Sequence, residues 1–134
     1  MYTFHDIRKS LNLNLAGTIF LAVFGAIYEY YSHGVYSYYM IYAFMIPLIM
    51  GVIPYIHLLT RGKFVSGMFL NFWNSAIATL SMGSVFQGVL KIYGTTNKLV
   101  IIYPVVTAIL IVVALVAAIM HIRANSFCEE GNKI

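Results

Sequence analysis

Long stretches of almost uninterrupted apolar residues alternate with short polar connections along this chain. Each stretch is about 20 residues or longer, and an α-helix of that length crosses a hydrocarbon layer about 30 Å thick. The pattern predicts four membrane spans and a polar tail, at residues 11–31, 35–59, 64–90, 99–122 and 123–134. Because the connections are short, we expect neighbouring spans to run antiparallel, as an up-down four-helix bundle in one domain of residues 1–134.

The pattern favours helices over the strands of a membrane barrel. Barrel strands alternate polar and apolar residues in segments of about 10 residues. The run from Leu99 to Met120 is almost entirely Val, Ile, Leu and Ala, without alternation. A helix satisfies its own backbone hydrogen bonds in lipid, so the predicted fold class is all-α and integral to the membrane.

The composition agrees with a bilayer as solvent. Of 134 residues, 61% are hydrophobic and 9% are charged, whereas soluble domains have roughly 25% charged residues. A chain this small and apolar cannot bury its own surface, so the lipid bilayer is its expected partner. No long basic run occurs, so the sequence does not suggest nucleic-acid binding, and no nucleic-acid partner is expected.

The basic residues predict the orientation, because loops that stay in the cytoplasm keep Lys and Arg. Six lie near the two ends and the central connection, and only Lys91 and Lys98 lie on the other side; the six are Arg8, Lys9, Arg61, Lys63, Arg123 and Lys133. Both termini are therefore expected in the cytoplasm. Short loops and the absence of Asn-x-Ser/Thr sites favour a prokaryotic plasma membrane.

Polar residues in the third span are the first candidate functional set. At 100° per residue, a broad face of this helix collects Asn71, Asn74, Ser75, Thr79 and Ser81. Such a stripe avoids lipid, so it predicts either packing against other helices or the lining of a pore or cavity.

The second span contains Pro47, Gly51 and Pro54. Each proline removes an N–H donor and frees a carbonyl group, so these residues predict a kinked helix. The kink is compatible with a hinge or binding site, and equally with an ordinary membrane helix.

A second candidate site combines Glu29 with His33 near the end of the first span. If the helix continues through both, residues four apart share a face, and the pair could bind a proton or cation. The alternative is a glutamate that reaches water at the membrane interface.

A third candidate is the pair His57 and His121, which end the second and fourth spans at similar depth. Two facing imidazoles could hold a non-covalent haem as cofactor. Isolated histidines at an interface are also common polar end residues, and no metal-binding motif accompanies them.

Three functional hypotheses remain open. The first is an oligomeric transport or channel subunit for a small solute or ion, in which the third-span stripe faces the path. The second is a non-enzymatic accessory or regulatory protein that binds another membrane protein. The third is a haem-binding or other redox membrane protein. No nucleophile–base pair points to an enzyme.

Overall fold

The computed structural model describes residues 4–62 and 65–131, which are mostly helical and contain no strand. Three long helical segments are α1 (Phe4–Tyr31), α5 (Gly67–Ile92), and α6 (Ile102–Gly131) with the preceding 3-10 helix η2 (Lys98–Ile101). These three are long and apolar enough to cross a membrane. The all-α prediction is confirmed, and the three long apolar helices are consistent with a membrane protein.

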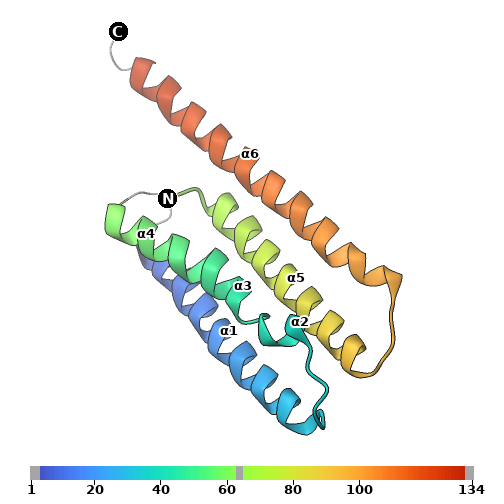
Figure 1. Cartoon of the computed structure of the whole chain (residues 1–134). Helices are drawn as coiled ribbons and strands as arrows, with labels where there is room; N and C mark the ends of the chain where they lie inside the picture. The colour runs from blue at the N-terminus through green and yellow to red at the C-terminus, as the bar shows by residue number, and fades with distance from the viewer. Residues whose placement is uncertain (1–3, 63–64, 132–134) are drawn as a thin grey trace.

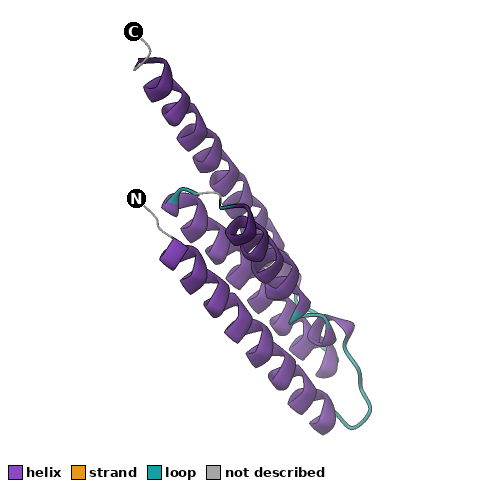
Figure 2. Ribbon diagram, turned by 90° about the vertical axis from the view of Figure 1, so that its left-hand side faces the viewer, coloured by secondary structure: helices purple, strands orange, loops and turns teal. Residues whose placement is uncertain are grey.

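Four shorter elements lie between α1 and α5: α2 (Tyr38–Ile41), α3 (Met45–Pro47), the π-helix η1 (Leu48–Val52) and α4 (Ile53–Arg61). Helix α1 packs along α3, η1 and α4, while α5 packs against α2 and α3 (Figure 1). Helix α6 lies on the other side of α5 and, among the described elements, contacts only α5 and η2. Figures 1 and 2 show that α6 also extends beyond the other helices.

The segment predicted as one span at residues 35–59 is interrupted in the structure. A turn at residues 42–44 separates α2 from the continuous helical segment Met45–Arg61. Pro47 explains the break, because its ring clashes with the carbonyl group four residues earlier and it has no N–H to donate. A helix that restarts at Met45 places Pro47 in its first turn, where neither problem arises.

Pro54 has a different consequence, because it lies inside the helical segment. In an α-helix the carbonyl oxygen of Met50 would accept a hydrogen bond from the N–H of residue 54, which proline lacks. The indole Nε1 of Trp73 on α5 donates to this oxygen at 2.8 Å. The π-helical turn η1 lies just before Pro54, and there the Ile53 N–H bonds the Leu48 carbonyl oxygen. A side chain from a neighbouring helix thus supplies the hydrogen-bond donor that Pro54 lacks.

The helices are longer than the predicted spans. Helix α1 begins at Phe4 rather than near residue 11, and α6 continues through most of the predicted tail to Gly131. The 30 residues of α6 extend over about 45 Å at 1.5 Å per residue, which exceeds a hydrocarbon layer of about 30 Å. The predicted start of the third span at Phe64 and the tail residues 132–134 lie outside the described residues.

Glycine residues end two of the helices at the connections. Gly62 follows α4 with φ 61° and its N–H bonds the carbonyl oxygens of Leu58 and Leu59. Gly94 follows α5 with φ 70°, and the next residue, Thr95, donates its N–H to the Leu90 carbonyl oxygen at 3.0 Å. Both are left-handed helix ends, which glycine adopts without a steric penalty.

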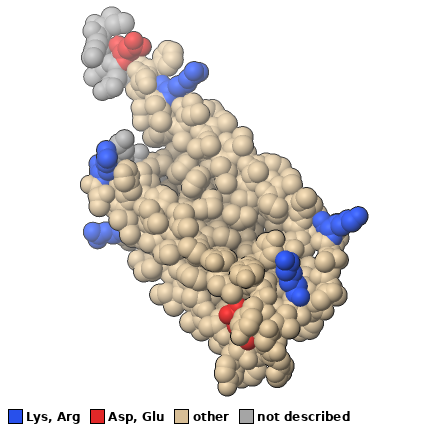
Figure 3. Space-filling view, in the orientation of Figure 1, with Lys and Arg blue, Asp and Glu red and all other residues tan. Residues whose placement is uncertain are grey.

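On one face of the molecule, a wide band of the surface carries no Lys or Arg side chain (Figure 3). On the face shown in Figure 3, Lys and Arg side chains gather toward the two ends of the molecule, and none lies in the band between them. A bilayer requires this distribution, because a charge in the hydrocarbon layer is costly.

We expect Trp73→Phe to destabilise the fold by about 1 kcal/mol, because the Met50 carbonyl group then lacks its donor in an apolar environment. Pro54→Ala restores a backbone N–H to this carbonyl, so Trp73→Phe should cost less in that background. The measurement is unfolding in detergent micelles, analysed as a double-mutant cycle of the four proteins. If Trp73→Phe lowered the stability equally with and without Pro54→Ala, Trp73 would not be the donor that replaces the missing N–H of Pro54.

Candidate functional site

A network of side-chain hydrogen bonds joins α1, α4 and α5. The Asn14 Nδ2 and the Tyr55 hydroxyl both donate to Asn74 Oδ1, at 2.9 and 2.8 Å. Asn74 Nδ2 donates to the Ser10 hydroxyl oxygen at 3.1 Å, and Asn14 Nδ2 also donates to the Ser10 carbonyl oxygen at 2.8 Å. Tyr55 is only 1% exposed. These polar groups stabilise the contact of three helices because each has a partner away from water.

Gly51 belongs to the same contact. A Cβ atom at this position would lie 2.5 Å from the Cγ and Oδ1 atoms of Asn14. The absence of a side chain therefore lets η1 approach α1 closely enough for Asn14 to reach α5. Of the three predicted kink residues, Pro47 lies in the first turn of a helix, Pro54 leaves the Met50 carbonyl oxygen for Trp73, and Gly51 makes room for Asn14.

The residues predicted to form one polar stripe on α5 point in two directions. Asn74 takes part in the network with α1 and α4, and Ser81 is buried, its hydroxyl without a hydrogen-bond partner among the described residues. Asn71 and Ser75 are exposed, and Thr79 is half-exposed. The Ser75 and Thr79 hydroxyls donate to carbonyl oxygens one turn earlier in α5, those of Asn71 and Ser75. The described part of one chain therefore contains no continuous row of these side chains along an internal path.

Glu29 and His33 do not share a helical face. Helix α1 ends at Tyr31, and His33 has a left-handed backbone with φ 52°, followed by Gly34 with φ 90°. The Ser32 backbone N–H and hydroxyl both donate to the Glu29 carbonyl oxygen, which closes the turn. The Glu29 side chain is half-buried, and its Oε1 has no hydrogen-bond partner among the described residues. His33 is exposed.

His57 and His121 lie on helices that do not touch. His57 is on α4 and His121 is on α6, and the described elements show no contact between these two helices. Both side chains are exposed. One chain therefore does not bring the two imidazoles together around a haem. Within residues 4–62 and 65–131, no group of three or more His, Cys, Asp or Glu side chains could hold a metal ion.

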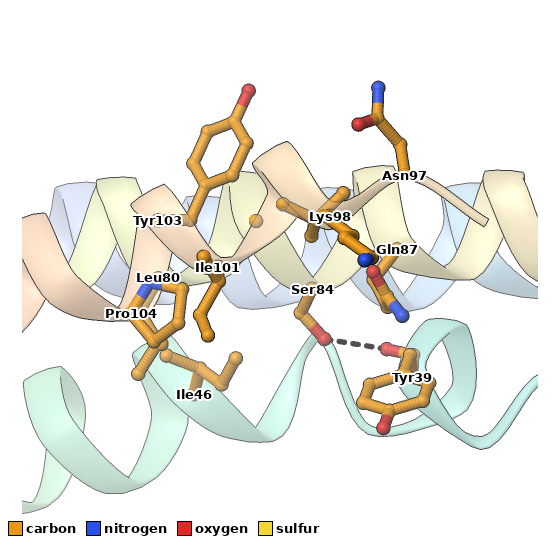
Figure 4. A pocket seen from close by; sticks show the side chains of 12 residues that line it. Tyr39, Ile46, Leu80, Ser84, Gln87, Asn97, Lys98, Ile101, Tyr103 and Pro104 are labelled. Atoms are coloured by element: carbon orange, nitrogen blue, oxygen red, sulfur yellow. Dashed lines mark hydrogen bonds between the residues drawn. The ribbon is translucent and has the colours of Figure 1, made fainter.

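A groove in the surface lies between α2, α3, α5 and the η2–α6 unit (Figure 4). This part of the molecule is at the end opposite both termini (Figure 1). We call this hollow the lateral groove, with a volume of about 750 Å³. Its walls are formed by Tyr39, Ile46, Leu80, Gly83, Ser84, Gln87, Asn97, Lys98, Val100, Ile101, Tyr103 and Pro104.

Close backbone contacts position the walls of the lateral groove. Met40 on α2 is 1% exposed and contacts the α1 backbone at Gly25 and the α5 backbone at Gly88. A Cβ atom at either glycine would lie 3.1–3.3 Å from Met40 atoms. The Ser84 hydroxyl donates to the Tyr39 carbonyl oxygen at 2.7 Å (Figure 4). On the opposite wall, Gly83 lies directly against Tyr103 of α6, leaving no room for a Cβ atom.

The two ends of the lateral groove differ in chemistry. Figure 4 shows Lys98, Gln87 and Asn97 toward one end, and Ile46, Leu80, Ile101, Tyr103 and Pro104 toward the other. Asn97 is tied to the start of η2, where its Oδ1 accepts the Leu99 N–H at 3.0 Å. Lys98 is the only charged residue of the lining, and its side chain is exposed. An apolar cavity with polar groups at one end suits a molecule that is itself amphiphilic.

Sequence reasoning did not find this groove. Its lining comes from four elements separated by up to 65 positions, from Tyr39 to Pro104. Most of these residues are apolar and are indistinguishable from lipid-facing residues in a helical pattern. Lys98 and Asn97, next to an apolar span, are the one local signal that could have suggested a polar rim.

Comparisons with protein families, curated proteins and solved structures found no match to this chain. The site therefore has to be interpreted from its own geometry.

We expect Gly51→Ala to destabilise the fold by about 1–3 kcal/mol, because its methyl group displaces the Asn14 side chain from the network. The matched control is Gly17→Ala on α1, where a Cβ atom meets nothing within 4 Å. That change should be neutral or stabilise the helix by up to about 1 kcal/mol. Thermal unfolding in detergent measures both; an equal effect of the two substitutions would refute the packing argument.

Proposed function

We propose that this protein is a non-enzymatic integral membrane protein that binds a small amphiphilic solute in the lateral groove, as one subunit of an oligomeric transport assembly. The groove carries this proposal. Its volume of about 750 Å³ lies within the range of roughly 300–1,000 Å³ that ligand pockets occupy. Its lining is mainly apolar, polar groups lie toward one end, and it opens on the surface, so a solute could enter from the bilayer.

The exposed polar residues of α5 support the proposed oligomer. Asn74 is engaged within the chain, whereas Asn71 and Ser75 lie on the outside of α5 and Thr79 is half-exposed beside them. The Ser75 and Thr79 hydroxyls already donate to carbonyl oxygens of their own helix, but the exposed Asn71 amide is unfavourable in lipid unless another protein surface covers it. A polar path in the assembly would therefore lie between copies of the chain rather than within one.

An accessory role is the second candidate, and α6 is the observation that favours it. This helix contacts only α5 and η2 among the described elements, so most of its surface remains free for another membrane protein. Its last turns are exposed and extend beyond the other helices (Figure 2). Haem binding has no such support, since His57 and His121 lie on helices without mutual contact.

For the orientation, we propose four crossings in an up-down arrangement, with both termini on the cytoplasmic side of a prokaryotic plasma membrane. Helix Met45–Arg61 would be the short second crossing, with α2 completing its passage to the outer side. The six-to-two distribution of basic residues supports this orientation. The lateral groove then opens toward the outer leaflet.

The orientation can be tested with single cysteines in a Cys128→Ser background, since Cys128 is the only native cysteine. Thr96 and Thr60 are exposed at opposite ends of the molecule, after α5 and within the last turn of α4. We expect a membrane-impermeant maleimide to label Thr96→Cys in intact cells and Thr60→Cys only after permeabilisation. The reverse pattern would overturn the orientation.

Native mass spectrometry of the protein, gently extracted from its own membrane, tests the proposed function. We expect a homo-oligomer that carries a discrete small-molecule adduct. Leu80→Trp should remove the adduct, because the larger side chain fills the apolar end of the lateral groove. Val112→Trp is the matched control, since Val112 on α6 is 59% exposed and lies outside the groove lining.

The outcomes separate the two candidate functions and test whether the groove is the binding site. A homo-oligomer whose adduct is lost in Leu80→Trp and kept in Val112→Trp supports the transport subunit. A complex with a second polypeptide, without a small-molecule adduct, would overturn it in favour of the accessory role. Adducts that neither substitution affects would show that the groove is not the binding site.

A further inference from the structure

We infer that the amphiphile of the lateral groove is an anionic phospholipid, bound with an acyl chain along the apolar walls and its phosphate beside Lys98. This inference deepens the proposed function and rests on it. It names the class of molecule that the groove selects.

The charged side chains that line the groove or touch its wall, those of Lys98 and Lys91, are both positive. Lys98 is the only charged residue among the lining residues, and no Asp or Glu belongs to the lining. A second cation, Lys91, has its ammonium group 4.8 Å from the ring centroid of Tyr39, which is itself a wall residue. Among the described residues, Lys98 has no hydrogen bond or ion pair that would neutralise it. An anion at this end is therefore favoured, and a cation is repelled.

A polar donor next to Lys98 fits a phosphate group. Figure 4 shows the Gln87 amide at the same end of the groove as the Lys98 ammonium, whereas the Asn97 amide points away from both. The Gln87 side chain has no hydrogen bond to a described residue, so its amide is available to donate. A lysine ammonium with an amide donor beside it is a suitable set for phosphate oxygens.

The apolar end of the groove lies further along the helix axis than Lys98, where the acyl chain of a lipid with its phosphate at Lys98 would lie. Lys98 opens η2, and Pro104 lies six residues further along the chain in the first turn of α6. At about 1.5–2 Å per residue this separation is about 10 Å along the helix axis. Ile46 and Leu80 continue the apolar wall on the facing elements (Figure 4). A bilayer lipid already has its headgroup at the interface and its chains below, so it can enter the open side without leaving the membrane.

The test uses purified, delipidated protein in nanodiscs that contain phosphatidylglycerol and phosphatidylcholine in equal amounts, followed by native mass spectrometry of the retained lipid. We expect phosphatidylglycerol to be retained about fivefold over phosphatidylcholine, which corresponds to one basic residue near the phosphate. Lys98→Gln should abolish this preference, and Lys98→Arg should keep it. Arg123→Gln is the control, because Arg123 is exposed on the part of α6 far from the groove.

The possible failures are distinguishable. Equal retention of the two lipids, with both lost in Leu80→Trp, would overturn the anionic preference and leave the groove as a binding site. A preference that Arg123→Gln reduces as much as Lys98→Gln would also overturn it, because the effect would then be one of net charge. A fatty acid as the mass retained from native membranes would overturn the phospholipid assignment. Retained lipid that Leu80→Trp does not change would refute the groove and the proposed function together.

Discussion

Inside a bilayer, each polar group of a protein must find its partner within the protein, because the hydrocarbon offers none. Helices meet this requirement for the backbone, and the structure shows what happens where a helix cannot. Pro54 leaves the Met50 carbonyl group without its N–H donor, and the indole of Trp73 donates to that oxygen from a different helix. Pro47 is accommodated by a helix that restarts just before it.

The same requirement organises the side chains. Asn14, Tyr55 and Asn74 bond one another across α1, α4 and α5, and Gly51 leaves the space for Asn14. These groups hold the helices together and are therefore not available to line a path through one chain. The serine and threonine hydroxyls on the outside of α5 bond their own helix instead. The polar residues that a functional site would need are found at the rim of the lateral groove.

The packing of α6 explains why such a groove exists. Among the described elements, helix α6 contacts only α5 and the preceding η2, and the neighbouring α2 ends after four residues. Between them the surface is hollow, with Gly83 held against Tyr103 on one wall and Ser84 bonded to the Tyr39 backbone on another. An interrupted helix and a peripheral helix therefore produce a cavity that four complete, mutually packed helices would fill with side chains.

The sequence by itself determined that this chain is all-helical and suited to a bilayer, because apolar stretches of this length dictate helices in lipid. It also placed the prolines, whose effect on the backbone is local. It did not determine that Asn74 turns inward while Asn71 and Ser75 turn outward, since a helical wheel shows a face without showing its neighbour. Nor could it show that His57 and His121 lie on helices without mutual contact, or that Tyr39, Leu80 and Lys98 line one groove. Only the tertiary structure decided these, because they depend on which helices pack together.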